Sequence, residues 1–354
     1  MNKDVAILIE KYIDLSELLK DDNILKYNKI VADLFISNKC NLSCKHCYFG
    51  DTTNIKPSLI FEEWLYTINS LYDNGIRHFH ISGKECSLEP QSINIINHIK
   101  SKKDTYCGVV TNGTGNSSYY EKLIKENIDY IEFSIDGFEY QHNYIRNNNT
   151  FQTTLESIKN IVKKSPPETI NIATTLNNNN WREYIDLISY FHKIGVTRFF
   201  ATPFLEKGEG IKINNLLLSS YHFAQLIMDT FSFMERCVEK GIIIKYCVPH
   251  HLIMTLLNEN QYISNITHKY FKGENDLVFR IKDNIFQLSF PFIELDYLNM
   301  LIITNDGYII PCADDICYPN YSEFALGNIR ENTIKEILEK RICAIKQEIN
   351  NLLN

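Results

Sequence analysis

Residues 30–48 read IVADLFISNKCNLSCKHCY, and this stretch decides the fold. Residues 30–37 form a mostly apolar run of the length of a buried strand, and three cysteines follow at CxxxCxxC spacing. From here to about residue 204, short β-rich runs alternate with segments of helical period, which predicts successive βα units and a parallel sheet. The cysteines are then expected in the loop after the first strand, at the carboxyl end of the sheet, where barrel active sites are built.

Six such units can be read from the sequence. The predicted strands are Ile30–Ser37, His78–Ser82, Tyr106–Thr111, Tyr130–Ile135, Thr169–Leu176 and Arg198–Thr202. The predicted helices between them are Leu59–Asn74, Gln91–Lys102, Tyr119–Glu126, Phe151–Lys164 and Trp181–Ile194. Because six units are too few for a closed eight-stranded barrel, we expect an α/β fold built as an open, partial (β/α)6 TIM-like barrel.

Beyond Pro203 the alternation ends, and a smaller α+β unit is expected. Its predicted elements are a helix at Ser220–Lys240, a strand containing Cys247, a helix from about His251, a hairpin formed by Leu301–Thr304 and Tyr308–Ile310 around Asn305-Asp306-Gly307, and a final helix at Ile334–Asn350. The expected domains are a helical lead-in at 1–29, the barrel at 30–210 and a C-terminal extension at 211–354.

Composition bounds the class of protein. A hydrophobic content of 44%, a charged content of 22% and a net charge of −7 are typical of a soluble globular protein and give no support to a nucleic-acid partner. No run approaches the roughly 20 apolar residues that span a bilayer, and the N-terminus does not resemble a signal peptide, so we expect a cytoplasmic protein without a membrane partner. The ten cysteines then indicate metal ligation or catalysis rather than disulfides.

The cysteine loop, defined here as residues 40–48, carries the strongest chemical signal. Thiolates of Cys40, Cys44 and Cys47 can bind three irons of a 4Fe-4S cluster, which leaves the fourth iron open to bind a small molecule. On spacing alone, two other interpretations stay open. One is a zinc site completed by His46, and the other is a set of reduced cysteines without metal.

The loop resembles the cluster motif of radical S-adenosylmethionine (SAM) enzymes, in which an aromatic residue accompanies the last cysteine, as Tyr48 does here. The resemblance covers roughly residues 30–204. It implies that Cys40, Cys44 and Cys47 are the catalytic cluster ligands and that SAM chelates the open iron. One electron then cleaves SAM to a 5′-deoxyadenosyl radical, which abstracts hydrogen from the substrate. A flavodoxin or ferredoxin is the expected electron donor.

The resemblance also implies a set of SAM-binding residues at the strand ends. The family usually has Gly-Gly-Glu-Pro after the second strand, and here Lys84 and Cys86 depart from that pattern. The implied contacts are Tyr48, Ser82, Gly83, Lys84, Glu85, Asn112, Ser134, Asp136 and Arg146.

Structural alternatives stand beside several of these roles. Turn chemistry explains Asn-Gly and Asp-Gly equally well, and Arg146 fits a solvated surface. Cys86 is either a buried filler or a redox group. The Asn-rich runs at 147–149 and 177–180 are predicted to be solvated loops, although Asn177 ends a predicted strand.

The C-terminal segment resembles the SPASM or twitch extension of this superfamily. The resemblance rests on Pro311-Cys312 after the hairpin and on Leu326-Gly327-Asn328-Ile329. Because few cysteines remain, it implies one auxiliary iron-sulfur cluster rather than two, bound by Cys312 and Cys317 with Cys247. Cys237 and Cys343 lie in helical patterns and are expected to be buried apolar residues.

Many relatives with such extensions modify ribosomally made peptides, so the resemblance favours a peptide substrate that is crosslinked, epimerised or oxidised. Residues 1–29 are too few for a winged-helix leader-binding domain, which favours a separate leader-binding protein or recognition by the barrel. The alternative is a dehydrogenase or epimerase of a sugar or aminocyclitol. A degenerate, non-catalytic peptide-binding relative and a zinc-binding module are further alternatives.

Overall fold

A computed structural model describes residues 30–49, 57–213, 215–248, 276–289, 300–311, 316–318 and 320–353. The helical lead-in predicted at 1–29 and the helix predicted from about His251 lie outside these residues, as does Cys312. Among the helices described, none is both long and apolar enough to cross a membrane.

The described strands form one sheet in the order β12-β11-β10-β1-β2-β3-β4-β5-β6-β7-β9-β8. From β10 through β7 to β9 every neighbouring pair is parallel, whereas β8, β11 and β12 pair antiparallel with their neighbours. The strands are β1 Val31–Leu34, β2 His78–Ile81, β3 Tyr106–Thr111, β4 Tyr130–Ser134, β5 Ile170–Leu176, β6 Arg198–Pro203, β7 Ile243–Cys247, β8 Asp276–Ile281, β9 Asn284–Ser289, β10 Met300–Ile303, β11 Tyr308–Ile310 and β12 Gly327–Asn328.

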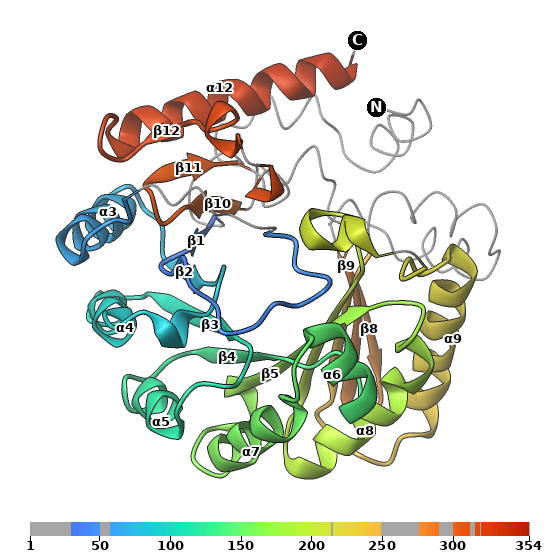
Figure 1. The fold of residues 1–354 in the computed structure, drawn as a ribbon. Coiled ribbons are helices and arrows are strands. Elements are labelled where there is room, and N and C mark those ends of the chain that lie inside the picture. Colours follow the sequence, from blue (N-terminus) through green and yellow to red (C-terminus); the bar gives the residue numbers. More distant parts are fainter. Residues whose placement is uncertain are drawn as a thin grey trace.

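Helices line the outside of the curved sheet (Figure 1). They are α3 Phe61–Asp73, α4 Ser92–Lys100, α5 Ser117–Lys125, α7 Phe151–Val162, α8 Tyr184–Ile194 and α9 Ser220–Arg236. A shorter helix, α6 Glu139–Arg146, follows β4 at the carboxyl ends of the strands, and α12 Ile334–Leu353 ends the described chain.

The alternation of side chains along the strands explains how the sheet is covered. In β5, Ile170 and Ile172 are buried in the core between sheet and helices, whereas Asn171 and Thr175 are half-buried on the opposite, inner face. Strands of parallel sheets are usually apolar on both faces. Here the outer face is the more apolar one, so the core lies between the sheet and the helices and the inner face carries more polar groups.

The six predicted βα units are present, with strand bounds within three residues of those expected. The parallel array nevertheless continues past six strands, because β7 pairs with β6, β9 with β7 and β10 with β1. The sheet therefore runs across the boundary expected at residue 210, and the division into domains stays a prediction. Two features were not predicted, helix α6 and the β8–β9 hairpin, whose turn places Lys282 at a φ of 54°.

Candidate functional site

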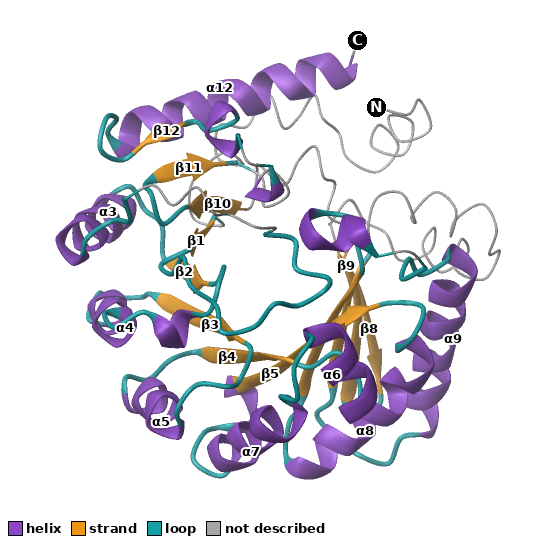
Figure 2. Cartoon of the chain, viewed as in Figure 1, coloured by secondary structure: helices purple, strands orange, loops and turns teal. Residues whose placement is uncertain are grey.

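The cysteine loop is fixed at the carboxyl ends of the strands by main-chain hydrogen bonds. Glu85 N donates to Lys39 O (2.8 Å), Lys45 N to Ile145 O (2.8 Å), and Glu209 N to Cys47 O (2.8 Å). The loop crosses the inner side of the curved sheet (Figure 2). Since three different segments hold it, the loop is preorganised rather than free to collapse.

The three thiols of the loop are accessible to different degrees. Cys40 is exposed, and Cys44 and Cys47 are half-buried. Leu42 N donates to Cys40 Sγ (3.4 Å), and Arg146 Nη1 lies 3.9 Å from Cys44 Sγ. Burial raises the pKa of the Cys44 thiol to about 11, against the opposing effect of the Arg146 guanidinium. Metal binding replaces the thiol proton, so three thiols on one anchored loop fit the ligand set of a cluster.

His46 is engaged away from the thiols. Its Nε2 lies 3.2 Å from Asp136 Oδ2, and both side chains are largely buried. Within the described part of the chain, no three His, Cys, Asp or Glu side chains converge as ligands of a single metal ion. The geometry therefore does not support the zinc interpretation in which His46 is the fourth ligand. Thiolates that bind different irons of a cubane are spaced more widely than ligands of one ion.

Glu85 is buried, at 1% exposure, and ties the ends of β2 and β3 together. Its carboxylate accepts hydrogen bonds from Ser87 N (3.1 Å), the Thr111 hydroxyl (2.8 Å) and Asn112 N (2.8 Å). These bonds direct the carboxylate into the protein. Sequence reasoning expects Glu85 to contact SAM, and this contact stays a prediction; the structure shows that the side chain itself bonds within the protein.

Asn112 connects the end of β3 to the cysteine loop. Its Nδ2 donates to Asn41 Oδ1 (2.9 Å) and lies 3.9 Å from Cys40 Sγ, and its Oδ1 accepts from Thr114 N (2.9 Å). Ser134, the last residue of β4, is half-buried on the same inner face as Glu132. Both residues thus lie at the rim where they were predicted, Asn112 beside the cluster motif and Ser134 on the inner face.

Ser82 turns inward to a polar group that the sequence did not reveal. Its hydroxyl donates to Asp33 Oδ1 (2.8 Å), which also lies 3.3 Å from His80 Nδ1. Burial alone would lower the pKa of His80, but Asp33 and, more weakly, Glu132 raise it. His80 Nε2 is buried without a hydrogen-bond partner. The signal for this group was present in the alternation His78-Phe79-His80-Ile81, which places both histidines on the inner face.

The other predicted SAM-binding residues near β2 are Gly83, whose role is in the main chain, and Lys84 and Tyr48, whose side chains lie at the surface. Gly83 has a φ of +99°, and a Cβ there would lie 3.1 Å from the Phe35 ring, so this turn requires glycine. The Lys84 ammonium lies 5.7 Å from the centroid of the Phe49 ring, and Tyr48 is 36% exposed. These residues lie at the carboxyl ends of the strands, beside or within the cysteine loop.

Cys86 is fully buried, and its thiol donates to Val110 O (3.4 Å). Burial raises the pKa of this thiol well above its usual value. The structure thus favours a core filler over a redox group.

Asp136 and Arg146 form a buried ion pair, with Arg146 Nε 2.7 Å from Asp136 Oδ2. Burial would raise the pKa of Asp136, but Arg146 and His46 outweigh it and hold that pKa well below its usual range. Arg146 is therefore not a solvated surface residue. Asn180 donates to Asp136 O (3.2 Å) and, like Asn177, is buried, so the prediction of a solvated loop at 177–180 is wrong for these two residues, whereas Asn179 is exposed. The run was predicted to be solvated because asparagine is polar, but the Asn180 side-chain amide instead bonds a main-chain carbonyl just after a strand.

The auxiliary-cluster residues are only partly described. Cys247 ends β7 and is half-buried, Cys317 is half-buried after β11, and Cys312 lies outside the described residues. The predicted ligand set thus stays a prediction. Cys237 is buried as expected, whereas Cys343 is exposed on α12, so its predicted burial is wrong.

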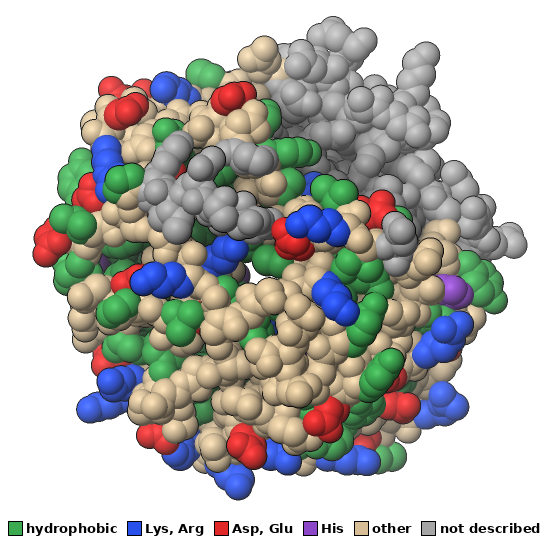
Figure 3. Space-filling model, viewed as in Figure 1, with side chains coloured by type: hydrophobic (Ala, Val, Ile, Leu, Met, Phe, Trp, Pro, Cys, Tyr) green, Lys and Arg blue, Asp and Glu red, His purple; other side chains and the backbone are tan. Residues whose placement is uncertain are grey.

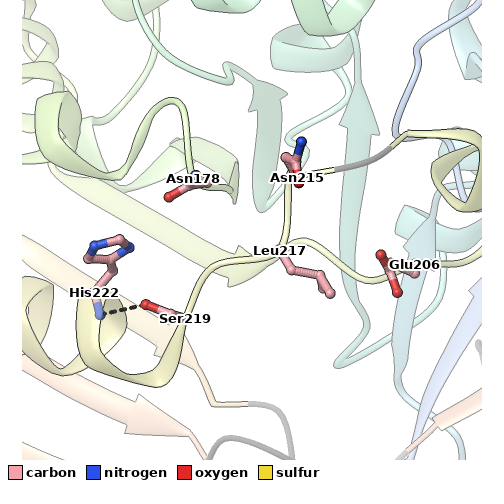
Figure 4. Close-up of a pocket in the computed structure, with 6 residues that line it drawn as sticks. All are labelled: Asn178, Glu206, Asn215, Leu217, Ser219 and His222. Atoms are coloured by element: carbon pink, nitrogen blue, oxygen red, sulfur yellow. Dashed lines mark hydrogen bonds between the residues drawn. The ribbon is translucent and has the colours of Figure 1, made fainter.

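A cavity of about 730 Å³ opens beside the loop that follows β6. Figure 4 shows the residues that line it, which are Asn178, Glu206, Asn215, Leu217, Ser219 and His222. The His222 ring stacks on Trp181 at 4.7 Å, and its Nδ1 is buried without a hydrogen-bond partner. Gly208, near this wall, packs directly on the main chain of Tyr48, so the cavity adjoins the segment that supports the cysteine loop. Figure 3 shows that the molecule, viewed as in Figure 1, is hollowed near its centre.

Two family models match the chain. Residues 34–195 match the radical SAM superfamily, and residues 297–351 match SPASM, an iron-sulfur cluster-binding domain. The first match begins at the last residue of β1 and contains the cysteine loop and all elements from α3 to α8, and the second contains β10 to β12 and most of α12.

Curated relatives include two proteins of Bacillus subtilis (strain 168). The sporulation killing factor maturation protein SkfB is 26% identical over 192 residues, which is 52% of this chain and 46% of SkfB. The antilisterial bacteriocin subtilosin biosynthesis protein AlbA is 31% identical over 83 residues, 23% of this chain and 18% of AlbA. The chain thus matches less than half the length of either relative.

Solved structures share the fold over most of the chain. Streptococcus suis SuiB bound to the precursor peptide SuiA superposes with a TM-score of 0.66 at 16% identity, covering 92% of this chain and 67% of SuiB. The anSMEcpe structure with bound AdoMet and the Cp18Cys peptide gives a TM-score of 0.63 at 19% identity, covering 90% of this chain and 83% of anSMEcpe.

Proposed function

The chain belongs to the radical S-adenosylmethionine superfamily, and from this premise we propose that it is an enzyme that modifies a ribosomally made peptide. The observation that carries the proposal is the cysteine loop, which presents three thiols from one anchored segment at the carboxyl end of the sheet. Cys40, Cys44 and Cys47 would hold the 4Fe-4S cluster. Once bound, the cluster and SAM supply a 5′-deoxyadenosyl radical that abstracts a hydrogen atom from the substrate.

The rim residues divide into two groups in this proposal. Gly83, Lys84, Asn112 and Ser134 border the inner side and remain proposed SAM contacts. Glu85 also remains a proposed contact, and its carboxylate supports the neighbouring strand ends by accepting hydrogen bonds from Ser87 N, the Thr111 hydroxyl and Asn112 N. The electron donor would be a flavodoxin or ferredoxin.

The substrate class is inferred from relatives and from the adjoining cavity. SkfB is a maturation protein of a killing factor, AlbA serves bacteriocin biosynthesis, and SuiB was solved with a precursor peptide. Among the solved structures, SuiB and anSMEcpe were each determined with a bound peptide. Asn178 and Asn215 line the cavity and carry both donors and acceptors, as pairing with a peptide main chain requires. We propose that the cavity holds a segment of the peptide beside the residue that reacts.

The decisive experiment is an iron count on protein purified and reconstituted without oxygen. The wild type should lose about four irons when Cys40, Cys44 and Cys47 are all replaced by alanine, since each cubane holds four. An equal iron content in both proteins would overturn the cluster assignment. With dithionite and SAM, the wild type should release 5′-deoxyadenosine, and the triple variant should not.

A second measurement tests the substrate class. A precursor peptide encoded beside the gene should change mass, or take up one deuterium from D₂O, only with wild-type enzyme and SAM. Asn178→Ala should raise the peptide concentration for half-maximal rate while leaving peptide-free SAM cleavage unchanged. SAM cleavage without any change in such a peptide would refute the peptide proposal and leave the cluster assignment intact.

A further inference from the structure

Helix α6 packs against the cysteine loop at several points outside the ion pair already described. Lys45 N donates to Ile145 O (2.8 Å), and the Asn147 amide donates to Ser43 Oγ (3.2 Å). The Lys45 ammonium lies 3.4 Å from the centroid of the Tyr144 ring. The position of α6 therefore determines where the middle of the loop lies.

Asp136 links this helix to the sheet. Its Oδ2 faces Arg146 Nε (2.7 Å) and His46 Nε2 (3.2 Å), and its Oδ1 accepts from Thr175 N (2.9 Å). The main chain of Asp136 is bonded as well, because its N–H donates to His142 Nδ1 (3.3 Å). One buried carboxylate thus connects the ends of β4 and β5, helix α6 and the cysteine loop.

Arg146 reaches the sulfur of a cluster ligand with the edge of its guanidinium that Asp136 does not use. Nε is held by Asp136, and Nη1 lies 3.9 Å from Cys44 Sγ, at the distance of a long hydrogen bond to sulfur. The guanidinium side chain is only 11% exposed, so water screens its charge weakly. The rigid fork of an arginine is what allows one side chain to bond both groups at once.

We propose that Asp136 and Arg146 are positioning residues that fix the Cys44 segment for the cluster, and that the Arg146 guanidinium, held by Asp136 against the Cys44 sulfur, raises the cluster's reduction potential. The proposal rests on the assignment of Cys40, Cys44 and Cys47 as cluster ligands. Reduction adds an electron to the cluster, and a buried cation donating to a ligand sulfur favours the more negative state. The pair would therefore ease electron transfer from the donor.

The test is an EPR-monitored redox titration of reconstituted wild type, Arg146→Met and Arg146→Lys, together with the rate of iron release to a chelator. The signal followed is the one missing from the Cys40/Cys44/Cys47→Ala variant. Arg146→Met should shift the reduction equilibrium about tenfold against reduction, equal to about 59 mV for a one-electron couple, and should release iron faster. Arg236→Met is the matched control, because that arginine is exposed and donates within its own helix, α9, to Ser232 O (3.0 Å).

The conservative variant keeps the test decisive if Arg146→Met does not fold. A lysine retains the charge but cannot bond Asp136 and Cys44 in a fixed fork, so Arg146→Lys should still release iron faster than wild type. A wild-type potential and release rate in either folded variant would overturn the proposal. If the triple cysteine variant keeps all its iron, the cluster assignment itself is refuted, which is a different result.

Discussion

Replacing Glu85 with alanine should destabilise the strand ends more than it affects any bound molecule. The carboxylate accepts from Ser87 N, Asn112 N and the Thr111 hydroxyl. The Thr111 hydroxyl keeps the Tyr120 hydroxyl as a partner at 3.1 Å, but the two main-chain N–H groups lose their acceptor. A buried donor without a partner costs about 1–3 kcal/mol, so the free energy of unfolding should fall by about 2–6 kcal/mol.

Urea unfolding under argon measures this change through the fluorescence of Trp64 and Trp181, both buried. Glu85→Gln retains one carbonyl oxygen as acceptor and should lose about half as much. Glu121→Gln is the control, since its partner Lys164 is at 2.6 Å on the surface, with the two side chains 49% and 52% exposed. Breaking that pair should cost less than about 1 kcal/mol.

The two possible roles of Glu85 give opposite patterns. If the carboxylate contacts SAM, Glu85→Ala should unfold at the wild-type urea concentration and bind SAM far more weakly. If it ties β2 to β3, the unfolding midpoint falls and SAM binding weakens only in proportion to the disturbed loop. Unchanged stability with abolished SAM binding would refute the structural role of this carboxylate.

Three further predictions concern the buried residues His142, Gly108 and Cys86. Burial and the Arg146 guanidinium lower the pKa of His142 to about 3. The unfolded chain therefore binds the proton first, and the free energy of unfolding should fall as the pH drops below about 6.5, by up to about 1.4 kcal/mol per pH unit. His142→Gln should flatten this slope in urea titrations from pH 7 to 5, and an unchanged slope would contradict the assignment to His142. The Tyr130 ring fills the space that a Cβ at Gly108 would occupy, so Gly108→Ala should lower the free energy of unfolding by about 1–3 kcal/mol in the same assay. Adding Tyr130→Leu should restore part of the lost free energy. Full stability of Gly108→Ala would show that the ring moves freely. Cys86→Ala should keep the wild-type iron count and SAM cleavage, and a loss of cleavage in the folded variant would restore a redox role for that thiol.

The six βα units could be predicted because each strand is short, β-rich and followed by a helical period. What local patterning could not show is which strands join the sheet edges. β10 comes from residues 300–303, far along the chain, yet pairs in parallel with β1. Helix α6 was missed because it is short, its first residues Glu139 and Tyr140 are exposed, and its buried side consists of one polar and one apolar residue, His142 and Ile145.

The site shows a similar division between local and distant information. The CxxxCxxC spacing is contained in eight consecutive residues, Cys40 to Cys47, so the sequence displays it directly. The contacts of the rim are not local. Asp33 meets Ser82 across 49 positions, and Arg146 meets Cys44 across 102. The sequence therefore predicts that the polar residues lie at strand ends. It could not predict whether each side chain points toward the cysteine loop or toward a neighbouring strand.

The placement of the core explains how this rim tolerates departures from the family pattern. Stability comes mainly from the apolar outer face, where residues such as Ile131 and Ile172 are fully buried under the helices. Cys86 occupies a position where relatives usually have proline, and its burial in that core, with a hydrogen bond to Val110 O, stabilises the turn by other means. The inner face is packed as well, since the His80, Tyr106 and Tyr130 rings lie in contact there, but it also carries polar groups such as the Asp33–His80 pair.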